Sequence, residues 1–227
     1  MDLIKAIYDR RSIRSFKPDP VPKDVLARII DTSRWSPSGS NTQPWEFLIL
    51  GGTVLKEVKE RLVKATQPGP GKSPVAAHPD IPYPPMPEPF ISRQRALGKA
   101  MQAYLSPPRS DRQATNRIIR QTSAGHFFGA PNALIILVER EICPRAFLGL
   151  GMITQTIALT ALNYGLGTCI MSMVTYWPEI YRKMFQIPES KLIAFGIAIG
   201  YPDTDAPVNN FPRSREPLDT FVQWSGI

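Results

Sequence analysis

Residues 146–165, "AFLGLGMITQTIALTALNYG", decide the fold of this chain. Apolar side chains lie on nearly every face of this stretch, and Gly165 is typical of the residue that follows the end of a helix. A helix of this kind needs cover on most sides, so we predict that it is the central helix of a layered core. Five polar residues interrupt it, namely Thr154, Gln155, Thr156, Thr160 and Asn163. They argue against a membrane-spanning helix.

Short apolar runs elsewhere in the chain predict the strands that this helix covers. Residues 46–51, "EFLILG", residues 132–139, "NALIILVE", and residues 191–200, "KLIAFGIAIG", have the length and composition of buried strands. Residues 167–174, "GTCIMSMV", predict a further strand or an extended loop. The core therefore combines a sheet with at least one long helix.

Amphipathic spacing predicts further helices around the sheet. One covers residues 2–9 behind Asp2, a residue type that caps helices, and another runs from Lys23 to about residue 35 behind Pro22. The same reasoning predicts helices over 53–66, 91–105, 111–127 and 178–185. Helices mixed with strands and long connections indicate an α+β or α/β layered fold.

Composition excludes several classes of protein. A chain of 227 residues with 43% hydrophobic residues is long enough and apolar enough for a sizeable core. The start, "MDLIKAIYDRR", lacks the basic-then-apolar order of a signal peptide, so we expect a cytoplasmic protein. Two cysteines and two histidines suggest neither a disulfide framework nor a metal site.

The chain carries a formal net charge of +8, which favours an anionic partner. Its basic residues are spread along the sequence and do not form a run with interleaved aromatic residues, so nucleic-acid binding is not the favoured role. A small phosphorylated or carboxylated ligand can use the same positive field. We keep a basic anion-binding or nucleic-acid-binding protein without catalysis as the alternative from a different class.

Two segments are rich in proline, one between the first two predicted strands and one after the last. Residues 67–90 cannot hold a helix or a central strand, and they read either as a flexible linker or as a surface excursion or lid. Residues 201–227 form a polar C-terminal extension. Because neither side of the 67–90 segment has an independent domain pattern, we predict a single domain over residues 1–227.

Small polar and basic residues gather in three places. Arg10, Arg11 and Arg14 surround Ser12, and Arg213 and Arg215 form a second basic pair. Guanidinium groups suit phosphate or a carbonyl-rich ring, although each cluster alone also reads as a solvated surface turn. The third place, "SPSGSNTQPWEF" at 36–47, reads alone as a connecting loop. The sequence has no hydrolase motif such as GxSxG or HExxH.

Taken in order, "RRSIRSF" (10–16), "SPSGSNTQPWEF" (36–47), "AIGYPD" (198–203) and "PRSREPLD" (212–219) resemble the FMN-dependent nitroreductase family. The middle of the chain is similar to the branch that contains nitrobenzoate and nitroarene reductases. This resemblance implies an α+β fold with a central mixed β-sheet flanked by helices. It also implies an intertwined homodimer with an FMN-binding site at the subunit interface.

The resemblance also assigns residues to the cofactor. Arg10, Arg11, Ser12 and Arg14 match the first FMN-binding motif, with Arg14 near the pyrimidine edge of the flavin as an electrostatic stabiliser. Arg213 and Arg215 match basic residues near the phosphate. The polar loop that crosses to the other subunit's cofactor matches Pro37, Ser38, Ser40, Asn41 and Gln43. Met171 and Ser172 fall beside the N5/O4 edge, although a carboxylate and a glycine found there in other branches are absent here.

The activity that the resemblance implies is ping-pong reduction of nitroaromatic compounds. NAD(P)H reduces the flavin, and a small aromatic acceptor then takes electrons in pairs, from nitro to nitroso to hydroxylamine. The flavin carries the chemistry, so no acid–base residue and no metal is expected. A flavin or quinone reductase, or another reductive flavoenzyme of the same fold, remains the alternative within the family.

Overall fold

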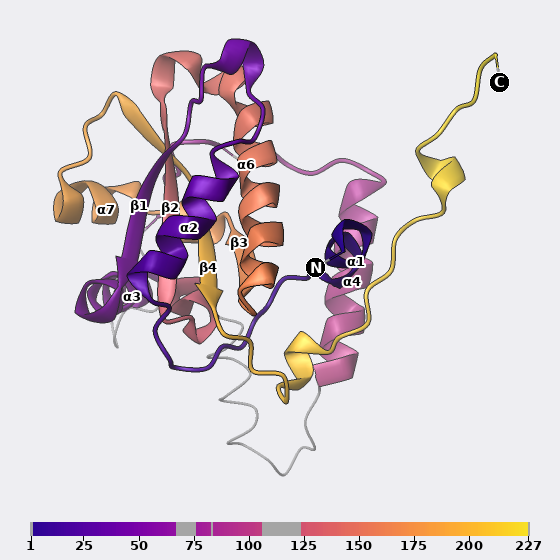
Figure 1. The fold of residues 1–227 in the computed structure, drawn as a ribbon, viewed down its shortest axis with the longest axis horizontal. Coiled ribbons are helices and arrows are strands. Elements are labelled where there is room, and N and C mark those ends of the chain that lie inside the picture. Colours follow the sequence, from indigo (N-terminus) through magenta and orange to yellow (C-terminus); the bar gives the residue numbers. More distant parts are fainter. Residues whose placement is uncertain (1, 67–75, 83, 106–123, 227) are drawn as a thin grey trace.

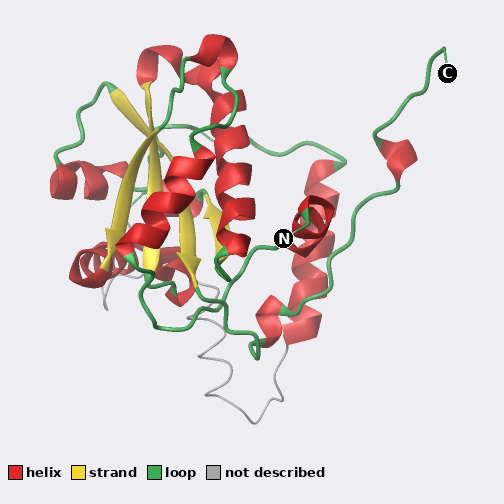
Figure 2. Ribbon diagram, viewed as in Figure 1, coloured by secondary structure: helices red, strands yellow, loops and turns green. Residues whose placement is uncertain are grey.

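Four strands form the sheet at the centre of the protein (Figure 1). The computed structural model describes residues 2–66, 76–82, 84–105 and 124–226. Within them the strand order is β1 (Glu46–Gly51), β2 (Asn132–Glu139), β4 (Lys191–Gly200) and β3 (Gly167–Met171). All four predicted apolar runs are strands, and the α+β class is confirmed (Figure 2).

The sheet departs from the mixed arrangement implied by the resemblance. Each pairing between the four strands is antiparallel, and the parallel pairing in the described residues is a single bridge between Ser12 and Thr168. The N-terminal segment leaves β3 after this bridge because Phe16 pairs with Pro202 instead. In the described residues, parallel pairing is therefore limited to one bridge at the β3 edge of the sheet.

The central helix, α6 (Cys143–Asn163), packs beside α2 (Lys23–Ser33) over one face of the sheet. Its buried side chains, among them Leu150, Ile153 and Ile157, join those of β2 and β4 in one apolar cluster. Gly165 follows the helix with a φ of 68°, as its sequence position predicts. The prediction of a core helix is confirmed, although the helix begins three residues earlier than predicted.

A second apolar cluster covers the opposite face of the sheet. There α3 (Gly52–Thr66) contributes Leu55, Val58 and Leu62, and α7 (Pro178–Phe185) contributes Tyr181. Side chains of β2 alternate between the two clusters, as the period of a strand requires. The sheet is thus covered by helices on both faces.

One face of α6 is not covered. By length and composition, the stretch Arg140–Asn163 is apolar enough to cross a membrane, with a mean hydropathy of 1.4. Core helices of folded proteins pass the same test, and 44% of the most apolar 18-residue window of this stretch is buried inside the protein. Phe147 and Leu148 lie on the part that remains exposed, with Leu148 at 69% exposure.

Two helices and the C-terminal extension lie to one side of the sheet (Figure 1). The first, α1 (Leu3–Asp9), begins at Asp2, whose carboxylate accepts from the backbone N–H of Lys5 at 2.8 Å. The second, α4 (Phe90–Leu105), buries none of its side chains. Tyr104 of α4 packs edge-on against Phe211 of the extension. These elements present apolar side chains that this chain does not cover.

The predicted helix over 111–127 lies largely outside the described residues. Its described end, Ala124–Gly129, forms a 3₁₀ turn and not an α-helix. Phe127 and Phe128 have φ values of 50° and 55°, which an α-helix does not contain. Both side chains are buried in the core, so tertiary packing has overridden the local helical preference.

The described part of the proline-rich excursion is fastened to the domain by an ion pair. Asp80 accepts from Arg182 Nη2 at 2.7 Å and from the backbone N–H of Ile193 at 2.8 Å. Both side chains of the ion pair are almost buried, at 10–11% exposure. The N–H of His78 also donates to the carbonyl of Tyr176 at 2.9 Å. Residues 76–82 are therefore held against α7 and β4.

We expect Asp80→Ala to lower the free energy of unfolding by about 3 kcal/mol, because it leaves the buried Arg182 guanidinium without its main counter-charge. Urea unfolding followed by circular dichroism measures this change. The control is Glu189→Ala, because Glu189 also pairs with Arg182 but is 81% exposed. Its loss should cost less than about 1 kcal/mol. Equal effects of the two variants would contradict the anchoring role of Asp80.

Candidate functional site

The basic segment near the N-terminus runs along the free edge of β3. The N–H of Ile13 donates to the carbonyl of Thr168 at 2.9 Å, and the Ile13 side chain is buried over Gly167. A Cβ atom on Gly167 would lie 2.4 Å from Ile13 Cγ1, so only glycine lets the segment approach this closely. Ser12 and Arg14 alternate with Ile13 and are half-buried.

The two basic clusters of the sequence meet in space. Arg213 donates to the carbonyl oxygens of Arg10 and of Tyr8, the latter at 2.7 Å, at the end of α1. Burial lowers the pKa of Arg213 below its ordinary value, and the nearby charges of Arg11, Arg10 and Arg215 lower it further. The two clusters that the resemblance assigns to one cofactor are therefore adjacent in the structure.

The described residues contain no ion pair to any of the five members of this arginine cluster, which are Arg10, Arg11, Arg14, Arg213 and Arg215. The nearby charge of Asp9 acts on Arg213 without forming an ion pair with it. In the part of the chain that the structure describes, the Arg14 guanidinium donates to the carbonyl of Ser12, at 3.4 Å. Guanidinium groups that form no ion pair at a partly buried surface are suited to an anionic ligand.

Met171 and Ser172 lie farther along the same strand edge. Met171 is the last residue of β3 and is buried, whereas Ser172 is half-buried and begins a 3₁₀ turn. Along an extended strand, Ser172 is about 13 Å from Thr168, where Ser12 pairs. Beyond that bridge, the described residues place no further strand on this edge. Its backbone groups are thus available to a ligand that extends from the arginines.

Cys169 lies between these two ends of the edge. Burial raises the pKa of its thiol, while the charge of Arg14 and a hydrogen bond with Ser12 act in the opposite direction. This places the Ser12 and Arg14 side chains next to the β3 edge.

The polar loop has an unusual backbone. Ser40, Asn41 and Gln43 have φ values of 51°, 54° and 46°, a left-handed region that non-glycine residues seldom adopt. The Ser38 hydroxyl accepts from the N–H of Gln43 at 2.9 Å and closes the loop. Concentrated backbone strain of this kind is typical of functional sites.

Within one chain, however, this loop does not reach the arginines. Gly149, near the start of α6, lies against Ser38 of the loop, whereas the arginine segment crosses near the other end of α6 (Figure 1). The helix between Gly149 and Asn163 is about 20 Å long. The loop and the arginine cluster therefore cannot hold the same part of one small ligand in a single chain.

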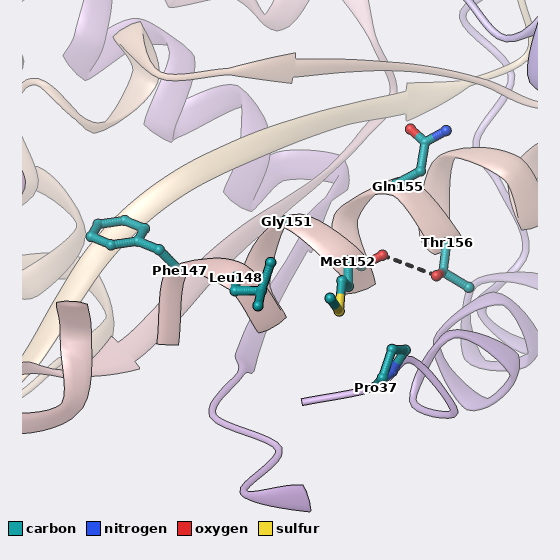
Figure 3. A pocket seen from close by; sticks show the side chains of 7 residues that line it. All are labelled: Pro37, Phe147, Leu148, Gly151, Met152, Gln155 and Thr156. Atoms are coloured by element: carbon teal, nitrogen blue, oxygen red, sulfur yellow. Dashed lines mark hydrogen bonds between the residues drawn. The ribbon is translucent and has the colours of Figure 1, made fainter. Parts of the chain in front are cut away.

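A groove of about 530 Å³ lies where the polar loop meets the exposed face of α6 (Figure 3). Pro37 of the loop forms one side of it, and α6 forms the other. Its α6 lining consists of Phe147, Leu148, Gly151, Met152, Gln155 and Thr156. The hydroxyl of Thr156 donates to the carbonyl of Met152, so the polar group of Thr156 is satisfied within the helix. The groove is apolar.

Comparison with known proteins shows which family this chain belongs to. The sequence model of the Nitroreductase family matches residues 7–201. The chain belongs to the nitroreductase family. Arg213 and Arg215 lie beyond the matched range, within the C-terminal extension.

Relatives that cover the whole length extend this comparison. A 4-nitrobenzoate reductase of Pseudomonas putida is 28% identical over 100% of this chain and 96% of its own length. A chloronitrobenzene nitroreductase of Comamonas testosteroni is 30% identical over 95% of this chain and 93% of its own. The crystal structure of an FMN and NADPH-dependent nitroreductase from Sphigopyxis sp. strain HMH covers 100% of both chains with a TM-score of 0.88 and 28% identity. This nitroreductase family member therefore shares its full length with these proteins.

Proposed function

We propose that this protein is an FMN-dependent oxidoreductase that uses NAD(P)H to reduce nitroaromatic compounds. The observation that carries the proposal is the cluster of arginines at the open edge of β3, which forms no ion pair with an acidic side chain among the described residues. Full-length similarity to a nitrobenzoate reductase and to an FMN and NADPH-dependent nitroreductase supports the substrate class and both cofactors. The proposal includes a single domain that acts in the cytoplasm, with residues 67–90 as a surface excursion or lid.

The residues present fit a flavin mononucleotide. Arg10, Ser12, Arg213 and Arg215 would surround the phosphate, for which guanidinium forks and a hydroxyl are suitable donors. Arg14 would face the pyrimidine edge of the ring, with Arg11 adding positive charge behind the segment. Backbone groups at Met171 and Ser172 would meet the N5/O4 edge.

Bound FMN would supply hydride and electron-pair transfer, and the protein's part is to bind, orient and polarise it. A cation at Arg14 favours negative charge that develops on the ring, an electrostatic effect that needs no acid or base. Among the described residues no acidic side chain pairs with Arg14, so its charge is available to the ligand. The side chains of this site would therefore act on the flavin by their charge and by holding it in place.

We propose further that the active protein is an intertwined homodimer. The polar loop would complete the site in the other subunit, so that the partner subunit's Ser40, Asn41 and Gln43 approach a flavin held by the first chain's arginines. The separation of about 20 Å along α6 supports this arrangement. The exposed face of α6 and the uncovered apolar side chains of α1, α4 and the C-terminal extension supply the apolar surface that a stable dimer buries.

Purification of the full chain tests the proposal. We expect a yellow protein with a flavin spectrum that bleaches on addition of NADPH or NADH and recovers on addition of 4-nitrobenzoate. A quinone and free FMN, tried as acceptors in parallel, distinguish the alternative of a quinone or flavin reductase. A colourless protein that neither binds added FMN nor oxidises either nicotinamide would support the anion-binding alternative instead.

A further inference from the structure

A buried asparagine, Asn209, joins the C-terminal part of the chain to the arginine segment. It is 5% exposed, and each polar atom of its side chain is used. Its Oδ1 accepts from the backbone N–H of Arg14 at 2.7 Å. Its Nδ2 donates to the carbonyls of Ser15 and of Asp203, both at 2.8 Å. Its own carbonyl accepts from Arg11 Nη1 at 3.0 Å.

These bonds fix how the segment is rotated about its own axis. The Asn209 amide holds the N–H of Arg14 and the carbonyl of Ser15, two adjacent residues of the segment. Side chains alternate along an extended segment, so holding these groups keeps Ser15 buried and turns the Arg14 side chain outward, beside the β3 edge. The same amide ties this rotation to the turn that leads to Arg213 and Arg215.

From this geometry we infer that Asn209 is a positioning residue for the flavin, acting through Arg14. The inference rests on the proposed FMN site. Asn209 lies on the far side of the segment from the β3 edge and acts on the ligand only by directing the Arg14 guanidinium. A buried asparagine in a loop gives no sequence signal of this role, because its partners lie 194 and 195 positions away.

The adjacent residue offers a matched control. Asn210 is exposed, and its Nδ2 donates to the carbonyls of Thr204 at 2.8 Å and Ala206 at 3.5 Å. It thus stabilises the same turn as Asn209, but the hydrogen bonds of its side chain do not reach the arginine segment. Any effect that comes only from the turn should appear in both alanine variants.

The experiment titrates FMN into Asn209→Ala, Asn210→Ala and wild-type apoprotein and follows quenching of flavin fluorescence. We expect Asn209→Ala to raise the Kd for FMN about tenfold and Asn210→Ala to change it less than twofold. At saturating FMN, the midpoint potential of the bound flavin should become more negative only in Asn209→Ala, because a displaced Arg14 no longer favours the reduced, anionic ring.

A double-mutant cycle identifies Arg14 as the intermediary. In an Arg14→Ala background, Asn209→Ala should raise the Kd less than twofold further, since the group it positions is gone. Folding of the variant is supported by the remaining bonds of the segment, Asp203 N–H to the Ser15 carbonyl and Lys17 N–H to the Tyr201 carbonyl. Asn209→Ser, whose hydroxyl cannot span from Arg14 to Asp203, serves as the second variant.

An unchanged Kd for FMN and an unchanged flavin midpoint potential in both Asn209 variants would overturn the inference. It would also be overturned if Asn209→Ala raised the Kd by the same factor in the Arg14→Ala background as in the wild type. Equal weakening by Asn209→Ala and Asn210→Ala would reduce Asn209 to a residue that only holds the turn. These outcomes differ from failure of the proposed function, in which the wild-type protein itself binds no FMN.

Discussion

Replacing Leu148 with arginine should convert the protein into a monomer that does not retain FMN. Leu148 is 69% exposed on the uncovered face of α6 and lines the apolar groove beside the polar loop. In the proposed dimer this face is buried, and an unpaired guanidinium there costs several kcal/mol of association free energy. Once the subunits separate, each arginine cluster loses the partner's polar loop, because the loop of its own chain lies about 20 Å away along α6.

Light scattering coupled to gel filtration gives the mass, and absorbance near the flavin band gives the FMN content per chain. Val54→Arg is the control, because Val54 is also exposed and apolar but lies on α3, over the opposite face of the sheet. It should leave a yellow dimer. A monomeric Leu148→Arg protein with full FMN content would show that the loop does not act in trans, and an intact dimer would remove α6 from the interface.

Replacing Arg14 with alanine should weaken FMN binding by about 10- to 100-fold, the effect of losing one charge-assisted hydrogen bond worth about 1.5–3 kcal/mol. Arg14 has no acidic partner in the described residues and contacts only the carbonyl of Ser12, so its removal leaves no buried protein charge unpaired. The loss should therefore appear in ligand binding and in the rate of flavin reduction by NAD(P)H more than in thermal stability.

Fluorescence titration and stopped-flow absorbance measure these two quantities. Arg28→Ala removes the same charge from the exposed surface of α2, where Arg28 pairs with Asp24 at 3.5 Å. It should leave both quantities within twofold of wild type. Tight FMN binding with a normal rate of reduction in Arg14→Ala would mean that the first motif is assigned to the wrong part of the ligand.

Local sequence patterns predicted secondary structure correctly where the backbone conformation depends on residues that are close in the sequence. The strands 46–51, 132–139 and 191–200 have the predicted bounds, and α1 begins at the predicted cap, Asp2. The predicted helix over 111–127 was wrong at its described end, residues 124–127, where a 3₁₀ turn leads into two buried phenylalanines with positive φ. There the core determines the backbone, and no local preference indicates it.

The polar residues of the candidate site also fall into two groups, those that local motifs indicated and those that only the structure brought together. The three basic and polar motifs were visible in the sequence, and the structure brings Arg213 of the second basic cluster to the carbonyl of Arg10 in the first. Asn209 and the ion pair of Asp80 with Arg182 were not visible. Each depends on a partner about a hundred or more positions away, and a single sequence does not indicate such a partner.

The sequence by itself determined the strands, most of the described helices, the family and the residue types that an anionic flavin needs, because periodicity, capping and turn chemistry act between near neighbours. Only the tertiary structure decided that the polar loop lies at the opposite end of α6 from the arginines, and that an amide from position 209 sets the rotation of the segment at position 14. Those relations depend on how the elements pack, since burial of apolar faces brings together residues that the chain itself keeps far apart.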